Sequence, residues 1–173
     1  MLSEKLTNAL RVIKDFPKEG ILFRDITPVL ADYSLYDEVI SEMENILKPY
    51  NIDTIVGLES RGFFFACPLA ERMKANFVPI RKPGKLPYDT YEVEYELEYG
   101  TDKLCMHTDA IKQGANVAII DDVLATGGTM NAAIRLVECA GLKPKICLAF
   151  MEIEEIDGRS TITEAPCQVL MRI

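Results

Sequence analysis

The sequence predicts an α/β protein with a central, mainly parallel sheet that is flanked by helices. Short apolar runs, each long enough for a buried strand, alternate along the chain with longer stretches in which apolar residues recur at helical spacing. This alternation is typical of parallel sheets, because crossover helices join consecutive parallel strands. Ligands of such sheets bind at the carboxyl ends of the strands, so the loops that follow strands are the candidate functional sites.

The composition sets the first limits on function. The chain has 173 residues, enough for one domain with a full core, and we expect a single domain over residues 1–173. The formal net charge of −8 argues against a nucleic-acid partner, whose phosphates attract basic surfaces. No apolar run approaches the length of a membrane span, and the charged, helix-periodic start (MLSEKLTNALRVIKDF) is unlike a signal peptide. We therefore expect no membrane association.

Cysteine and histidine usage restricts the chemistry and indicates a compartment. The five cysteines lack CxxC spacing, and Cys67, Cys139 and Cys147 lie in apolar surroundings. This pattern favours buried, reduced thiols and hence a cytoplasmic protein. The single histidine, His107, argues against a histidine-based metal site and against a Ser-His-Asp triad.

The first half of the chain predicts an N-terminal helix followed by strand–helix alternation. Apolar residues at 2, 6, 9, 10 and 13 form one helical stripe, which Phe16-Pro17 ends. A turn at 18–20 leads to an extended piece, Pro49 stops a second helix, and the apolar run DTIVGL predicts a buried strand. The expected elements are a helix at 2–13, an extended segment at 21–25, a helix at 36–47, a strand at 53–58, a helix from 60 or 61 to 74, and a strand at 76–80.

The second half predicts a hairpin and further strands. Two prolines and a glycine between lysines make 82–87 a loop, and strict alternation of Tyr, Val or Leu with Glu over 91–99 predicts a half-exposed strand. A turn at 100–102 precedes its hairpin partner. The remaining expected elements are strands at 103–107 and 117–120, a helix at 130–139, a strand at 145–151, a solvated acidic loop at 152–158 and a last strand at 168–173.

The stretch 116–129 (NVAIIDDVLATGGT) carries the strongest functional indication. An apolar run ends in Asp121 and Asp122, and the loop 126–129 (TGGT) then leads into a helix. Carboxylates at a strand end can accept hydrogen bonds from ribose hydroxyls or hold Mg²⁺ directly or through water. Backbone N–H groups of a glycine-rich loop can bind phosphate beside a helix N-terminus. The order favours a sugar-phosphate site over the alternative, a strand–turn–helix junction with solvated acids.

Two further segments can supply positive charge. The turn 57–62 (GLESRG) follows a buried strand, and with Arg61 it forms a candidate pyrophosphate site; the alternative is an ordinary turn with an exposed arginine. Arg81, Lys82 and Lys85 cluster in RKPGK, a loop that can close over an anion and exclude water. The alternative for this loop is a solvated hairpin.

Periodicity alone assigns Glu98 no function. It shares the polar face of the strand at 91–99 with Glu92, Glu94 and Glu96, which we expect to be solvated. Glu98 differs only in being the last of them, before Gly100, where a side chain can reach a site.

Several segments of the sequence resemble motifs of a known family. VAIIDDVLATGGT is similar to the phosphoribosyl pyrophosphate (PRPP) signature of the type I phosphoribosyltransferases. Further segments resemble the adenine-specific members of this family: FPKEGILFRDITPVL (16–30), GLESRGFFF (57–65), and RKPGKLP (81–87) with LEYG (97–100). The resemblance implies the type I phosphoribosyltransferase fold, with a small hood at about 1–30 and a flexible β-hairpin loop at about 82–106.

The resemblance also implies an activity in purine salvage. A glycosyltransferase of this kind moves the 5-phosphoribosyl group of PRPP to adenine, gives AMP and pyrophosphate, uses Mg²⁺ as cofactor, and forms a homodimer. Glu98 would accept or orient the purine proton and Tyr99 would assist loop closure, with Arg61 and Lys85 as the other catalytic residues. The implied ligand contacts are Asp121, Asp122, Ala125, Thr126, Gly127, Gly128 and Thr129 for ribose 5-phosphate, Glu59, Ser60 and Arg81 for pyrophosphate, and Leu22, Phe23 and Arg24 for adenine. Mg²⁺ would bind through the pyrophosphate and ribose of PRPP, with Asp121 or Asp122 contributing through water.

Two alternatives stay open on the sequence. A hypoxanthine, guanine or xanthine transferase would share the sugar-phosphate chemistry but would need contacts to a 6-oxo group. A regulator that senses PRPP without turnover would be favoured by an added DNA-binding domain or by loss of the closing loop, and this acidic chain has neither.

Overall fold

The computed structural model describes residues 1–96 and 100–173. The chain forms two compact units, Met1–Glu42 and Met43–Ile173. The second unit contains the main sheet and most of the predicted site residues.

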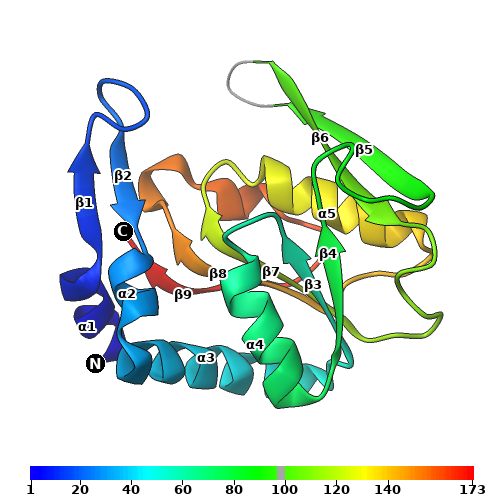
Figure 1. Cartoon of the computed structure of the whole chain (residues 1–173), viewed down its shortest axis with the longest axis horizontal. Coiled ribbons are helices and arrows are strands. Elements are labelled where there is room, and N and C mark those ends of the chain that lie inside the picture. Colours follow the sequence, from blue (N-terminus) through cyan, green and yellow to red (C-terminus); the bar gives the residue numbers. More distant parts are fainter. Residues whose placement is uncertain (97–99) are drawn as a thin grey trace. The chain divides into compact units, whose positions relative to one another are not determined.

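A five-stranded parallel sheet organises the second unit, as the alternation of strands and helices predicts (Figure 1). Its strands lie in the order β4-β3-β7-β8-β9 and comprise β3 (Thr54–Leu58), β4 (Asn76–Ile80), β7 (Val117–Leu124), β8 (Ile146–Glu152) and β9 (Cys167–Arg172). From β3 the chain crosses to β4 on one side, and from β7 it crosses to β8 on the other. Where the connections of two neighbouring strands run in opposite directions, the loops after those strands border a crevice that commonly binds ligands. The switch point between β3 and β7 is therefore the expected ligand site.

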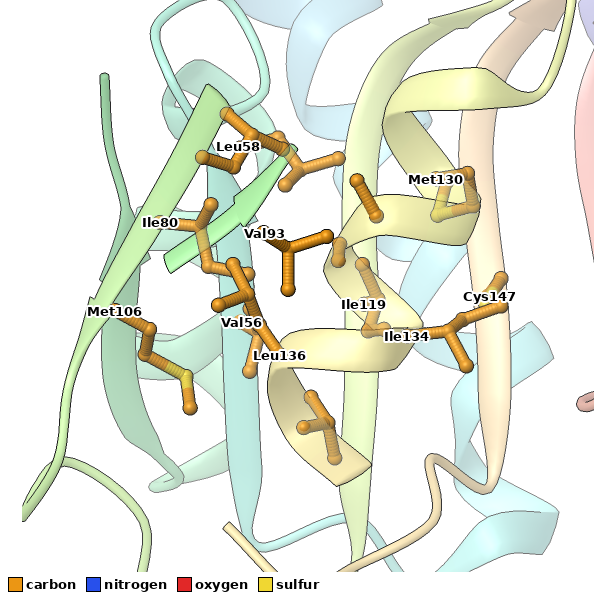
Figure 2. Close-up of a cluster of buried hydrophobic side chains, with 14 of the residues drawn as sticks. Val56, Leu58, Ile80, Val93, Met106, Ile119, Met130, Ile134, Leu136 and Cys147 are labelled. Carbon is orange, nitrogen blue, oxygen red and sulfur yellow. The ribbon is translucent and has the colours of Figure 1, made fainter. Parts of the chain in front are cut away.

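Helices cover both faces of this sheet in the second unit. Val56 of β3 and Ile119 of β7 pack with α5 (Gly128–Cys139) in a buried apolar cluster (Figure 2). The neighbouring residue Gly57 faces the other way, against α4 (Phe63–Met73), where an added Cβ would lie 2.8 Å from Ala66 Cβ. Strands with both faces covered explain the continuous apolar runs in the sequence.

The predicted hairpin is present, but the bounds predicted for its turn contain one error. β5 (Thr90–Glu96) and β6 (Thr101–His107) pair antiparallel, with Val93 and Tyr95 buried and the intervening glutamates exposed. The predicted turn at 100–102 is wrong at its last two residues. Thr101 pairs with Glu96 and Asp102 pairs with Tyr95, so both belong to β6.

The first unit contains a second hairpin that the sequence did not predict. Its elements are α1 (Leu2–Ala9), β1 (Arg11–Lys14), β2 (Leu22–Asp25), α2 (Thr27–Ala31) and the start of α3 (Tyr33–Leu47). The predicted helix over 2–13 is therefore too long: Leu10 is extended (ψ 131°), and β-branched Val12 and Ile13 pair with Arg24 and Phe23. The short helix α2 was also missed, although a proline at its start favours helix initiation.

Two strands of the second unit extend further than predicted, and both extensions contain acidic residues. β7 continues past Ile120 through both aspartates to Leu124. Glu152 was expected in a solvated loop, but it is the last residue of β8 and is only 2% exposed. The following segment forms two short 3₁₀ helices, η2 (Glu154–Ile156) and η3 (Gly158–Thr161), rather than an irregular loop.

The thiols are free, but their burial was only partly predicted. Cys147 is buried as expected, whereas Cys67 and Cys139 are exposed, because they lie on the outer sides of amphipathic helices. Among the helices of the described residues, none is long and apolar enough to cross a membrane.

Removing volume at the centre of the sheet should destabilise the protein. Ile119 is fully buried, so Ile119→Ala should lower the free energy of unfolding by about 2–5 kcal/mol. Urea denaturation at one fixed protein concentration measures this loss. Ile156→Ala serves as the control, because the Ile156 side chain is 47% exposed, and it should cost less than about 1 kcal/mol. Equal losses in the two variants would contradict the assigned core.

Candidate active site

Two buried carboxylates mark the carboxyl end of β7. Asp121 is 8% exposed and Asp122 is 4% exposed, and the Asp122 N–H donates a hydrogen bond of 2.8 Å to Asp121 Oδ1. Burial raises the pKa of the Asp121 carboxyl well above its usual range, and the adjacent charge of Asp122 raises it further. Burial also raises the pKa of Asp122, although the Arg61 guanidinium opposes this shift. The pair forms a concentrated, poorly solvated acceptor site.

Arg61 connects this pair to the loop that follows β3. Its Nε lies 2.7 Å from Asp122 Oδ2, which accepts no aligned hydrogen bond from the described residues, so the contact is an ion pair. Gly62 is the next residue, and an added Cβ there would lie 2.7 Å from Leu58 O and 3.0 Å from Asp121 Oδ1. The turn after β3 therefore packs directly against the carboxylates of β7, and the two predicted anion sites are neighbours.

Glu59 gathers the basic side chains of the loop after β4. Its carboxylate accepts hydrogen bonds from Arg81 Nε (3.1 Å) and from the Lys82 N–H (2.9 Å), and Lys85 Nζ lies 3.9 Å away. Partial burial would raise the pKa of Glu59, but these hydrogen bonds and the charges of Arg81 and Lys85 together hold it below its usual range. Glu59 is therefore a stable anion that fixes two cations beside Arg61's loop, and the Glu59–Ser60 peptide bond is cis.

The loop 125–129 joins β7 to α5, as the TGGT motif predicts. Gly127 has a φ of 83° and precedes the helix, and the Thr126 hydroxyl accepts a 3.4 Å hydrogen bond from the Gly128 N–H. The first N–H groups of a helix have no partner within that helix. This loop can therefore present N–H donors, together with the positive end of the helix dipole, to an anion.

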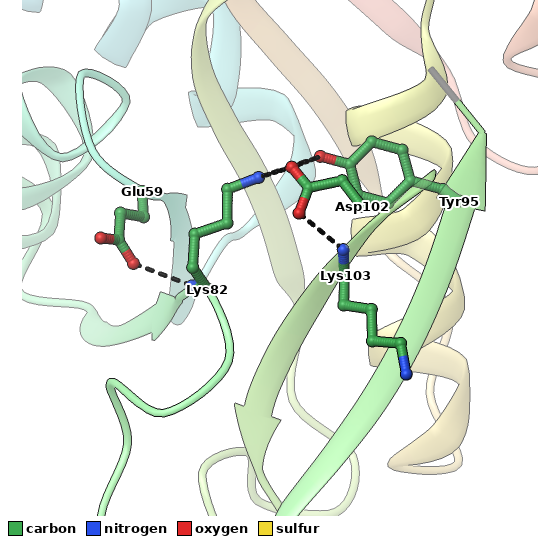
Figure 3. A network of polar contacts seen from close by, with 5 residues as sticks. All are labelled: Glu59, Lys82, Tyr95, Asp102 and Lys103. Atoms are coloured by element: carbon green, nitrogen blue, oxygen red, sulfur yellow. Dashed lines mark hydrogen bonds and ion pairs between the residues drawn. The ribbon is translucent and has the colours of Figure 1, made fainter. Parts of the chain in front are cut away.

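A network that was not predicted ties the loop after β4 to the β5–β6 hairpin (Figure 3). Lys82 Nζ contacts the Asp102 carboxylate and lies 3.2 Å from Tyr95 Oη, while its backbone N–H binds Glu59. Burial alone would lower the pKa of Lys82, but its bonds to Asp102 and Tyr95 raise it, and Lys82 in turn lowers the pKa of Asp102. A turn predicted with the right bounds would have placed Asp102 opposite Tyr95 in the hairpin and so indicated this contact.

The structure brings together most, but not all, of the predicted site residues. Glu59, Arg61, Arg81, Lys85 and the aspartates form the contacts above, and Ser60 is exposed in the same turn. Glu98 and Tyr99 lie outside the described residues. The three predicted adenine contacts, Leu22, Phe23 and Arg24, are all on β2 of the first unit, where the Phe23 ring meets Phe16 edge-on at 5.0 Å.

The donor set fits Mg²⁺ only as a partner of a bound phosphate. Within residues 1–96 and 100–173, no group of three or more His, Cys, Asp or Glu side chains is arranged to hold a metal ion. Mg²⁺ is commonly bound by one or two carboxylates together with substrate phosphates. The buried pair Asp121 and Asp122 matches that arrangement.

Comparisons with known proteins give a consistent assignment. The profile of the phosphoribosyl transferase domain family matches residues 30–159. The chain is 53% identical over 162 residues to the adenine phosphoribosyltransferase of Flavobacterium johnsoniae, covering 94% of this chain and 95% of the relative. It also superposes on the crystal structure of adenine phosphoribosyltransferase from Thermoanaerobacter pseudethanolicus with a TM-score of 0.96, 44% identity and full coverage of both chains.

A third relative links the fold to bound ligands. The adenine phosphoribosyltransferase of Saccharomyces cerevisiae, solved with D-2,5-dideoxy-2,5-imino-altritol 1,6-bisphosphate and adenine, has a TM-score of 0.93 and 40% identity, with 98% of each chain covered. The chain thus shares both its fold and high sequence identity with these relatives over nearly its whole length. The chain belongs to the phosphoribosyltransferase family and, within it, to the adenine phosphoribosyltransferases.

Proposed function

We propose that this chain transfers the 5-phosphoribosyl group of PRPP to adenine, with AMP and pyrophosphate as products, in purine salvage. The observation that carries the proposal is the junction of two different anion sites at the switch point between β3 and β7. One contains Arg61 with the cations gathered by Glu59, and the other contains the carboxylates and the 125–129 loop. A molecule with pyrophosphate at one end and a phosphorylated ribose at the other matches this pair of sites.

The cationic half is suited to the leaving group. Cleavage of the bond at ribose C1 leaves negative charge on pyrophosphate, which fixed donors stabilise without reorganisation. Arg61, Arg81 and Lys85 would supply that charge, and the turn containing Ser60 would supply backbone donors. Because its hydrogen bond to Glu59 already orients Arg81, less of the rotamer entropy of Arg81 remains to be lost on binding.

The carboxylate half is suited to the sugar. Asp121 and Asp122 would accept hydrogen bonds from the ribose hydroxyls, and the loop from Ala125 to Thr129 would bind the 5′-phosphate. Mg²⁺ bound to PRPP would neutralise charge on the pyrophosphate, and Asp121 or Asp122 would hold it through water.

The purine half of the reaction rests on family membership. Leu22, Phe23 and Arg24 are proposed as the adenine contacts, and Glu98 as the group that accepts or orients the adenine proton while its nitrogen attacks C1. Tyr99 and the loop over about 82–106 would exclude water during the reaction. A homodimer in the cytoplasm completes the proposal. Family membership supports the homodimer, and the five free thiols support a reducing compartment.

The choice of base tests the proposal directly. Purified protein with PRPP and Mg²⁺ should form AMP from adenine, with a kcat/KM at least about 100-fold above that for hypoxanthine, guanine or xanthine. Chromatography of the nucleotide products measures each reaction separately. Absence of AMP would refute adenine transfer, and a preference for a 6-oxopurine would establish the alternative base specificity.

Removing the proposed proton acceptor should slow the chemical step. Glu98→Ala should lower kcat by about 10²–10⁴-fold while PRPP still binds, because general-base catalysis contributes that range. Glu92→Ala is the matched control, since Glu92 is an exposed glutamate on β5, and it should leave kcat unchanged. If the Glu98→Ala variant turned over at the wild-type rate, Glu98 would not be the proton acceptor.

A further inference from the structure

A buried carboxylate with two arginine partners lies at the end of β8, where Glu152 pairs with Leu124, the residue that precedes the loop 125–129. Glu152, the last residue of β8, is 2% exposed, and its carboxylate pairs with two arginines. Oε1 lies 3.4 Å from Arg159 Nε, and Oε2 lies 3.4 Å from Arg172 Nε. A carboxylate buried in this way needs a compensating charge, which the two partly exposed arginines supply.

Main-chain hydrogen bonds direct the segment after Glu152 back over the end of β7. The Ile153 N–H donates to Leu124 O (2.9 Å), and Glu152 O accepts from the Ile173 N–H (3.0 Å). Leu124 is the last residue of β7 and directly precedes the loop. Arg159 then lies in η3, the 3₁₀ turn that follows.

The backbone of η3 is in close contact with the loop. A Cβ added to Gly158 would collide with Ala125 O and with the Thr126 carbonyl carbon. A Cβ added to Gly127 would in turn collide with Thr161 Oγ1 and with Gly158 O. Two stretches of main chain meet here with no space for a side chain between them, so a displacement of η3 moves the loop.

Hydrogen bonds connect the same contact to α5. The Thr161 hydroxyl donates to Gly158 O (2.7 Å), and it accepts from Asn131 Nδ2 (3.2 Å), which also donates to Thr161 O. Asn131 is in the first turn of α5, so η3 contacts both ends of the loop.

We infer that Glu152 and Arg159 form a clamp, here called the Glu152–Arg159 clamp, that positions the backbone donors of the 125–129 loop for a sugar phosphate. The two residues are positioning residues: they act through η3 and touch no proposed ligand atom. The inference deepens the proposed function, because it names residues that determine affinity for the 5′-phosphate but not for pyrophosphate. A misplacement of catalytic or binding donors by about 1 Å can cost up to about 100-fold, so a clamp of this kind has a measurable effect.

Calorimetric titrations with two separate probes, ribose 5-phosphate and Mg²⁺-pyrophosphate, test the clamp in the full chain. Glu152→Gln and Arg159→Gln should each raise the Kd for ribose 5-phosphate on the order of tenfold and leave the Kd for pyrophosphate within about twofold. Arg159→Lys keeps the charge and should restore part of the affinity. Glu154→Gln is the matched control, because this exposed carboxylate pairs with Arg172 but not with Arg159, and both affinities should remain unchanged.

The outcomes separate positioning from general damage. Unchanged ribose 5-phosphate affinity in Arg159→Gln, or equal weakening of both probes, would overturn the clamp; Arg159 is partly exposed, so this variant serves if Glu152→Gln does not fold. Ribose 5-phosphate binding requires no adenine. A selective loss without AMP formation by the wild type would therefore uphold the clamp and refute adenine transfer, whereas normal AMP formation with no selective loss would do the reverse.

Discussion

The burial of two adjacent carboxylates at the end of β7 is the constraint on which the rest of the site depends. Removing like charges from water is unfavourable unless donors replace the lost hydration. Arg61 supplies a counter-charge to Asp122, and the backbone N–H of Asp122 supplies a hydrogen bond to Asp121. Because Arg61 belongs to the loop after β3, this compensation draws that loop across the switch point of the sheet.

Elsewhere in the structure, carboxylates are likewise paired with nearby cations. Glu59 holds Arg81 and Lys85 near the turn after β3, and Lys82 connects Glu59 to the hairpin through Asp102. At the end of β8, Glu152 pairs with two arginines. In an acidic chain, each cluster of cations is thus organised by a buried or half-buried carboxylate, and the cations are oriented before any ligand arrives.

The sequence predicted the sheet and the positions of the loops after β3 and β7 well because their determinants are local. Continuous apolar runs mark β3 and β7, whose two faces are buried. Asp121, Asp122 and the TGGT loop closely follow the apolar run of β7 in the sequence, so their place near its carboxyl end was predictable. Contacts between distant segments were not predictable in this way. The burial of Glu152 depends on Arg159 and Arg172, and strand β1 depends on its pairing with β2. Glu98 shows the limit of periodicity, since only the family resemblance distinguishes it from the other glutamates of the strand predicted at 91–99.

The pH dependence of ribose 5-phosphate binding tests most directly whether the buried pair recognises the sugar. Ribose hydroxyls would bind the ionised carboxylates. The pKa values of Asp121 and Asp122 are raised, so on acidification these carboxylates are protonated before an ordinary Asp, with its pKa of about 3.9, is affected. Calorimetry on the wild type and on the double variant Asp121→Asn/Asp122→Asn separates this effect from titration of the phosphate itself, near pH 6. We predict that the wild type loses affinity on acidification well above pH ~4, beyond the loss seen in the double variant. Identical affinities and pH profiles for the two proteins would contradict the account.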